Sequence, residues 1–188
     1  YSTVESNRAA GGREIIRYDA ATGERTVLVS AKQLIPAGGK APLEIADYIW
    51  SDDNSQLLVF TNAKKVWRYN TRGDYWVLNL RTGKLQQLGK GLEASTLMFA
   101  KFSPDGTRVG YVSKQNIYVE DIATSRVTQI TADGGGNIIN GTFDWVYEEE
   151  LDCRDGFRWS PDGKTIAYWQ TDSKNIGTFY LIDNVSDI

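Results

Sequence analysis

Apolar and aromatic residues occur along this chain in short runs, which polar turns rich in aspartate, asparagine, threonine and glycine separate. One unit of this kind occurs three times, over residues 50–60, 102–111 and 159–168. Its serines, Ser51, Ser103 and Ser160, lie 52 and then 57 residues apart. In the Ser-Pro-Asp-Gly form, proline sets φ for the second turn position and glycine suits the fourth, so the unit predicts a β-hairpin.

A second turn motif alternates with the first. It covers residues 18–24, 78–84 and 120–126, and in each copy a short apolar or β-branched run precedes and follows the turn. Each period therefore holds about four short strands, and a period of roughly 40–50 residues with four strands is typical of a β-propeller blade. No long segment keeps a 3.6-residue period, so we expect few helices.

The pattern thus predicts an all-β fold, a partial β-propeller of about three to four four-stranded blades. Propellers typically close with four to eight blades. An open arc would expose two sheet edges, which favour aggregation. Either residues 1–188 are a segment of a longer protein or partner chains complete the ring, and we expect the segment.

Composition excludes several classes of function. The 21 basic and 24 acidic residues give a net charge of −3, so the chain lacks the basic excess expected of a nucleic-acid partner. No apolar run approaches the ~20 residues that span a bilayer. There is no histidine and only one cysteine, Cys153. The chain can build neither a His-dependent triad nor a multi-cysteine zinc site, and we expect no metal, no cofactor and no catalysis by this chain alone.

The repeat is interrupted between Thr131 and Trp159. Asp144 is suited to cap the N-terminus of a helix, and the three glutamates 148–150 suit its first turns. We therefore expect a short helical insert that carries these glutamates. Insertions on a rigid scaffold frequently carry function.

The segment Asp-Trp-Val-Tyr-Glu-Glu-Glu at 144–150 resembles the glutamate-rich motif of the dipeptidyl peptidase IV family of serine peptidases, known as family S9. Ile-Asn-Gly at 139–141 precedes it and a Trp-Ser-Pro-Asp-Gly hairpin follows, as in that family. Lys-Val-Trp-Arg-Tyr at 65–69 is similar to the family's Trp-Arg pair. The resemblance covers most of residues 45–185. The glutamate motif is specific, whereas many propellers share the hairpins. Residues 151–157 are more polar than in animal members and look closer to bacterial ones.

The resemblance implies an N-terminal eight-bladed propeller joined to a C-terminal α/β-hydrolase domain, which this chain lacks. It implies that Glu149 and Glu150 bind the free α-amino group of a peptide substrate. It implies that Arg68 contacts a substrate carbonyl. The partners would be peptides with a free N-terminus and the hydrolase domain of the same parent chain, and dimers are usual in the family.

The paired-glutamate chemistry depends on local structure. On a strand, adjacent side chains point to opposite faces and could not hold one guest. On a helix they diverge by about 100° but can straddle a group that lies between them. At an effective dielectric constant of 20, each ion pair at about 4 Å is worth roughly 4 kcal/mol before desolvation. A peptide amine has a pKa of about 7.7–8.0, so binding should weaken above that pH.

Other interpretations stay open. Glutamates 148–150 could form a solvated acidic helix start, and Arg68 could be a surface arginine. The whole protein could be a non-enzymatic propeller scaffold that binds proteins, or a family member whose hydrolase domain has lost its serine. A Gly-x-Ser-x-Gly motif downstream of residue 188 would favour the peptidase. For the compartment, we expect the periplasm or secretion rather than the cytoplasm.

Overall fold

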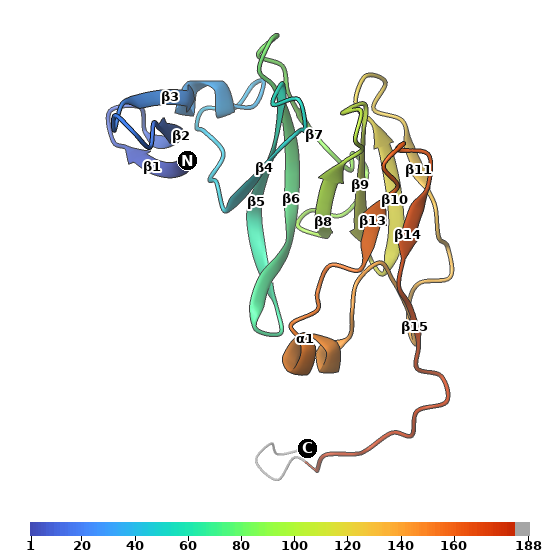
Figure 1. The fold of residues 1–188 in the computed structure, drawn as a ribbon. Helices are drawn as coiled ribbons and strands as arrows, with labels where there is room; N and C mark the ends of the chain where they lie inside the picture. The colour runs from blue at the N-terminus through green and yellow to red at the C-terminus, as the bar shows by residue number, and fades with distance from the viewer. Residues whose placement is uncertain (183–188) are drawn as a thin grey trace.

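A computed structural model describes residues 1–182 of the chain (Figure 1). Residues 183–185, the end of the segment that resembles the peptidase family, lie outside the described residues. The first sheet is antiparallel and contains β1 (Ser2–Asn7), β2 (Gly12–Tyr18) and β3 (Arg25–Val29). A short 3-10 helix, η1 (Ala31–Leu34), follows β3 and buries Ala31 and Leu34.

Two four-stranded antiparallel units form the centre of the molecule. The first contains β4 (Asp47–Trp50), β5 (Gln56–Val66), β6 (Tyr69–Asn79) and β7 (Leu85–Gln87). The second contains β8 (Leu97–Phe102), β9 (Arg108–Ser113), β10 (Asn116–Asp121) and β11 (Val127–Gln129). Arg72 and Gly73 of β6 pair with Met98 and Leu97 of β8, which joins the two units into one sheet.

The last unit is split into two pairs of short strands. Strand β13 (Phe157–Trp159) pairs with β14 (Ile166–Tyr168), and β12 (Ile138–Asn140) pairs with β15 (Gln170–Asp172). Helix α1 (Trp145–Leu151) lies between β12 and β13 in sequence and at the end of the long β5–β6 hairpin in space (Figure 1). The all-β prediction, the four-stranded blades and the short helical insert are confirmed, and the described sheets do not close into a ring.

The turns of the repeat are held by their own side chains. Ser103 donates its hydroxyl to Asp105 at 2.6 Å, and the Thr107 N–H donates to the same carboxylate at 3.0 Å. These hydrogen bonds, that of Ser103 first, lower the pKa of Asp105 to about 2. Ser160 and Asp162 repeat the arrangement in the last hairpin. Both aspartates therefore stabilise the turns of the repeat.

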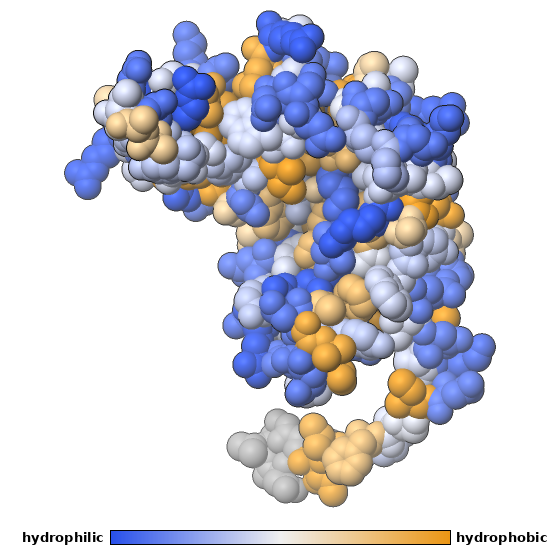
Figure 2. All heavy atoms as spheres, viewed as in Figure 1, coloured by the Kyte–Doolittle hydropathy of each residue, from blue (hydrophilic) through white to orange (hydrophobic). Residues whose placement is uncertain are grey.

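The core lies on the packed faces of the central strands. One cluster joins the two four-stranded units and contains Leu58, Val77, Leu97, Val109 and Tyr111. Between the second unit and the last, a Cβ on Gly110 would lie 3.1 Å from the Phe157 ring, so the two sheets are in close contact there. Apolar atoms are exposed in the extended tail at the bottom of Figure 2, where Phe179, Tyr180, Leu181 and Ile182 are each more than four-fifths exposed. Among the described residues, no helix has the length and apolar character needed to cross a membrane.

Candidate functional site

The helix that carries the three glutamates is fixed at both ends. Asp144 caps it by accepting a hydrogen bond from the Tyr147 N–H at 3.0 Å, as the sequence predicts. At the other end, Asp152 adopts a left-handed conformation with φ of 54°, and the Cys153 N–H donates to the Tyr147 carbonyl. Seven residues are thus held as two turns of helix, and the paired glutamates are helical and not on a strand.

Arg68 reaches the site from a different element. It lies with Trp67 in the turn between β5 and β6, where Val66 pairs with Tyr69. Both strands are eleven residues long, so the hairpin extends past its neighbours and its tip lies beside α1 (Figure 1). Trp67 takes a positive φ of 50°, a conformation that is uncommon for a bulky residue and marks a tight turn. Hairpin length therefore brings Arg68 to the glutamates across some 80 residues of sequence.

The closest contact of the site is an ion pair between Arg68 and Glu149. The Arg68 Nε lies 2.5 Å from the Glu149 Oε1. The same Oε1 has no hydrogen-bond partner by angle, so the contact is an ion pair that the N–H does not align as a hydrogen bond. The Glu149 side chain is 9% exposed, whereas that of Arg68 is 71% exposed. The carboxylate is thus nearly buried, whereas most of the Arg68 side chain is in contact with solvent.

The other two glutamates differ in exposure. Glu150 is exposed, while Glu148 is 5% exposed and one of its buried oxygens lacks a hydrogen-bond partner. All three line one open cavity of about 530 Å³ together with Arg68, Tyr69, Leu151 and Asp152. The structure thus brings Arg68, Glu149 and Glu150 to one cavity. It adds Glu148, whose burial sequence reasoning did not single out.

Two residues that the sequence did not indicate lie at this cavity, where Tyr69 is part of the lining and Arg154 packs against it. The Arg154 guanidinium lies 4.2 Å from the centre of the Tyr69 ring and 2.5 Å from Asp152. Its hydrogen bond to Asp152 raises the pKa of Arg154. Only the spatial arrangement shows these contacts, because Tyr69 and Arg154 lie far apart in the sequence. The cavity therefore joins three glutamates to Arg68, which suits a ligand with both a cationic and a carbonyl group.

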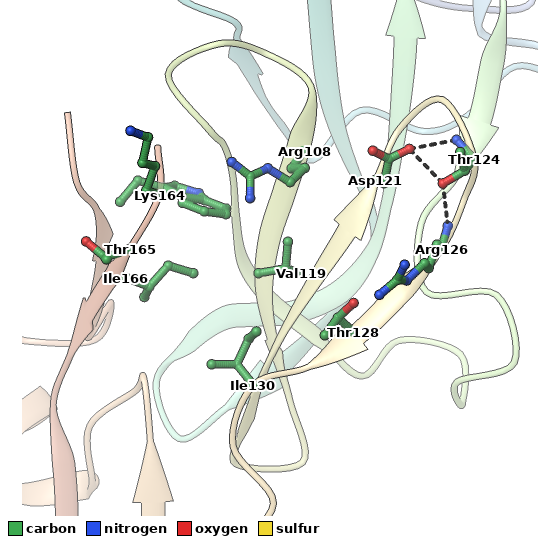
Figure 3. Close-up of a pocket in the computed structure, with 11 residues that line it drawn as sticks. Arg108, Val119, Asp121, Thr124, Arg126, Thr128, Ile130, Lys164, Thr165 and Ile166 are labelled. Atoms are coloured by element: carbon green, nitrogen blue, oxygen red, sulfur yellow. Dashed lines mark hydrogen bonds between the residues drawn. The ribbon is translucent and has the colours of Figure 1, made fainter. Parts of the chain in front are cut away.

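A second cavity of about 600 Å³ opens elsewhere, between β11 and β14. Arg108, Arg126, Lys164 and Ile166 are among its lining residues (Figure 3). Figure 3 shows Asp121 engaged with Thr124 at one side of it, where the hydroxyl donates at 2.7 Å. None of the glutamates of α1 lines this cavity, and it follows the gap between adjacent sheets. The smaller, acidic cavity beside α1 is therefore the candidate functional site. No cluster of three or more potential metal-ligating side chains is found within the described residues.

Comparison with known proteins assigns the chain to a family. The sequence model described as "Dipeptidyl peptidase IV (DPP IV) N-terminal region" matches residues 51–187. The chain belongs to the dipeptidyl peptidase IV family. A probable dipeptidyl-aminopeptidase B of Neosartorya fischeri is 31% identical over 181 residues, which are 95% of this chain and 19% of that protein. One of Penicillium rubens is 37% identical over 64% of this chain and 14% of its own length.

A solved structure supports the same family and fold. Porphyromonas gingivalis dipeptidyl peptidase 4 superposes with a TM-score of 0.77 and 28% identity, over 91% of this chain and 24% of that protein. The chain is therefore similar to the N-terminal propeller region of a dipeptidyl peptidase IV family member, and it spans about a fifth of the curated relatives' length or less. The predicted family is confirmed. The roles of Glu149, Glu150 and Arg68 stay a prediction.

Proposed function

We propose that this chain is the N-terminal propeller segment of a dipeptidyl peptidase IV-like serine exopeptidase. In the whole enzyme it holds the free N-terminal amine of a peptide so that cleavage falls two residues in and releases a dipeptide. The serine, aspartate and histidine of a hydrolase domain downstream would perform the acyl transfer. The present segment supplies specificity by anchoring, since a fixed amine fixes which peptide bond reaches the nucleophile.

The observation that carries the proposal is the unequal ion pair of Arg68 and Glu149. Glu149 is held on a capped helix and nearly buried, while Arg68 is mostly in solvent. An arriving ammonium group replaces the guanidinium as the positive partner of Glu149, so the nearly buried carboxylate is not left without a counter-charge when Arg68 moves away. Arg68 then remains beside the ligand with its guanidinium free to donate to a peptide carbonyl.

Glu150 supplies the second negative charge at the mouth of the same cavity. Adjacent helical side chains diverge by about 100°, so Glu149 and Glu150 approach a guest from two sides. An ammonium group at about 4 Å from both carboxylates gains roughly 4 kcal/mol per pair before desolvation. A neutral N-acetyl group would gain neither interaction. The site should therefore discriminate a free N-terminus from a blocked one.

Kinetics of the full-length gene product test the proposal. Dipeptidyl p-nitroanilides would be compared as free amines and as N-acetyl derivatives, in the wild type and in Glu149→Gln and Glu150→Gln variants. We expect each variant to lose at least about tenfold in kcat/KM on the free amines, because hydrogen bonds to charged groups contribute about 1.5–3 kcal/mol. Exposed Glu24, in the turn between β2 and β3, provides a matched control, Glu24→Gln, which should match the wild type.

Two results would contradict the proposal. One is a wild-type enzyme that cleaves free and acetylated substrates equally well. The other is an equal loss of kcat/KM on the free amines in Glu24→Gln and in Glu149→Gln. A full-length sequence that continues with blades alone, and without a Gly-x-Ser-x-Gly motif, would instead favour the non-enzymatic scaffold.

A further inference from the structure

The segment that carries α1 leaves the sheets and returns through a narrow base. Thr142 and Asp155 form an isolated antiparallel bridge. The Gly156 N–H donates to the Gly141 carbonyl at 3.0 Å. A Cβ on Gly141 would lie 2.8 Å from the Ile117 side chain, so this base is packed directly against the second four-stranded unit. Because both ends of the α1 segment meet at this base, the contacts that hold the base also hold the orientation of α1.

Lys101 of β8 inserts into this base from the neighbouring unit. Its Nζ lies 2.5 Å from the Asp155 Oδ1 and donates to the Phe157 carbonyl at 3.0 Å. The same Nζ lies 3.6 Å from the centre of the Phe157 ring. Only 20% of the Lys101 side chain is exposed. A long cationic side chain thus crosses between two sheets and is held by three groups around the point where the helical segment rejoins them.

Lys101 also belongs to the strand that supports Arg68. Strand β8 pairs with β6 through Met98 and Arg72, and β6 forms the long hairpin whose turn carries Arg68. Helix α1 and the hairpin tip have no strand pairing with each other in the described residues. The ammonium group of Lys101 therefore connects β8, which pairs with the hairpin that carries Arg68, to the base of the segment that carries Glu149.

We propose that Lys101 is a positioning residue, which sets the separation of Arg68 and Glu149 by holding Asp155 and the Phe157 carbonyl at the base of the α1 segment. Lys101 does not line the acidic cavity and would not touch the peptide. Its effect on substrate rests on the proposed function, because it acts through the anchoring of the amine. Its effect on the α1 segment does not, and the two parts can be tested separately.

Hydrogen exchange of the full-length protein tests the positioning directly. In Lys101→Met we expect amides of residues 144–156 to exchange about tenfold faster, with the other sheets unchanged. Lys101→Arg, which keeps the charge, should restore exchange to within twofold of the wild type. The exposed Lys164 of the last hairpin provides a control, Lys164→Met, which should have no effect. If Lys101→Met is poorly produced, Asp155→Asn removes the same contact from the other side together with the Arg158 ion pair of that carboxylate, and Arg158→Met separates the two contributions.

Steady-state kinetics tests the consequence for substrate. Lys101→Met should raise KM for free-amine dipeptidyl substrates about tenfold, leave kcat within twofold, and leave kcat/KM for N-acetyl substrates unchanged. A purely structural loss would lower the rates on both substrates together. Wild-type exchange in Lys101→Met would overturn the positioning role whatever the substrates do. If Lys101→Met exchanges faster but the wild type cleaves free-amine and N-acetyl substrates equally well, the positioning role is retained and the anchoring function is refuted.

Discussion

The buried ammonium group of Lys101 predicts a measurable dependence of stability on pH. Desolvation lowers the pKa of Lys101 from 10.5 to about 8, and the nearby Arg158 acts in the same direction, while Asp155 opposes it. Below pH 8, Lys101 is protonated in both the folded and the unfolded chain, so the folded state bears the full cost of the buried charge. Between pH 8 and 10.5 the unfolded chain binds more protons, so the free energy of unfolding rises with pH through this window.

The magnitude follows from the interval between the two pKa values. At about 1.4 kcal/mol per pH unit, the interval from about 8 to 10.5 corresponds to about 3 kcal/mol. In Lys101→Met this contribution is absent. The difference in the free energy of unfolding between wild type and variant should therefore shift by about 3 kcal/mol in favour of the wild type as pH rises from 7.5 to 10.5.

Urea unfolding followed by tryptophan fluorescence measures this difference, since the chain has six tryptophans. Burial also raises the pKa of Tyr75 and Tyr111, and their titration at high pH is common to both proteins and cancels in the comparison. Lys101→Arg stays charged at every pH used and gives a second reference. If the difference in the free energy of unfolding between wild type and Lys101→Met stays constant with pH to within about 0.5 kcal/mol, the argument that Lys101 carries a buried charge is refuted.

Three further predictions concern stability. Burial raises the pKa of Glu120, so the wild type should lose stability as pH rises above the unfolded value of about 4.3, and Glu120→Gln should lack this loss in urea unfolding at pH 4–8. A Cβ at Gly141 would lie 2.8 Å from Ile117 at a φ of +74°, so Gly141→Ala should cost about 1–3 kcal/mol, whereas Gly177→Ala, which meets nothing within 4 Å, should match the wild-type Tm. Phe157 is 1% exposed, so Phe157→Ala should cost about 3–5 kcal/mol in urea unfolding. For Phe179→Ala, at an exposed position, the loss should stay below about 0.5 kcal/mol, and equal losses in the two variants would contradict the assigned core.

Local signals in the sequence were sufficient for much of the fold. The Ser-Pro-Asp-Gly turns, the alternating strands and the Asp144 cap each depend on residues within a few positions of one another. Ser103 and Asp105 bond to each other, as do Asp144 and Tyr147. Interactions of this kind are encoded in short stretches, so pattern and turn chemistry predict them. The family resemblance then brought Arg68 and the glutamates into one hypothesis.

Contacts between distant segments were not accessible in this way. Lys101 and Asp155 are 54 positions apart, and nothing in either local sequence indicates that they meet. The sequence also treated Glu149 and Glu150 as equivalent. Their unequal burial arises because the β5–β6 hairpin tip covers one side of α1, which places Arg68 on Glu149 and leaves Glu150 exposed. Pairing between sheets and the packing of a helix against a hairpin decide these features.

The central claim is that Glu149 and Glu150 hold the ammonium group of a peptide. The most direct measurement is a crystal structure of the full-length protein with a non-cleavable free-amine peptide. The account predicts the amine nitrogen at about 3 Å from both carboxylates, with Arg68 turned from Glu149 to a peptide carbonyl. A bound peptide whose amine lies away from α1, with the Arg68–Glu149 pair intact as in the unbound chain, would contradict it.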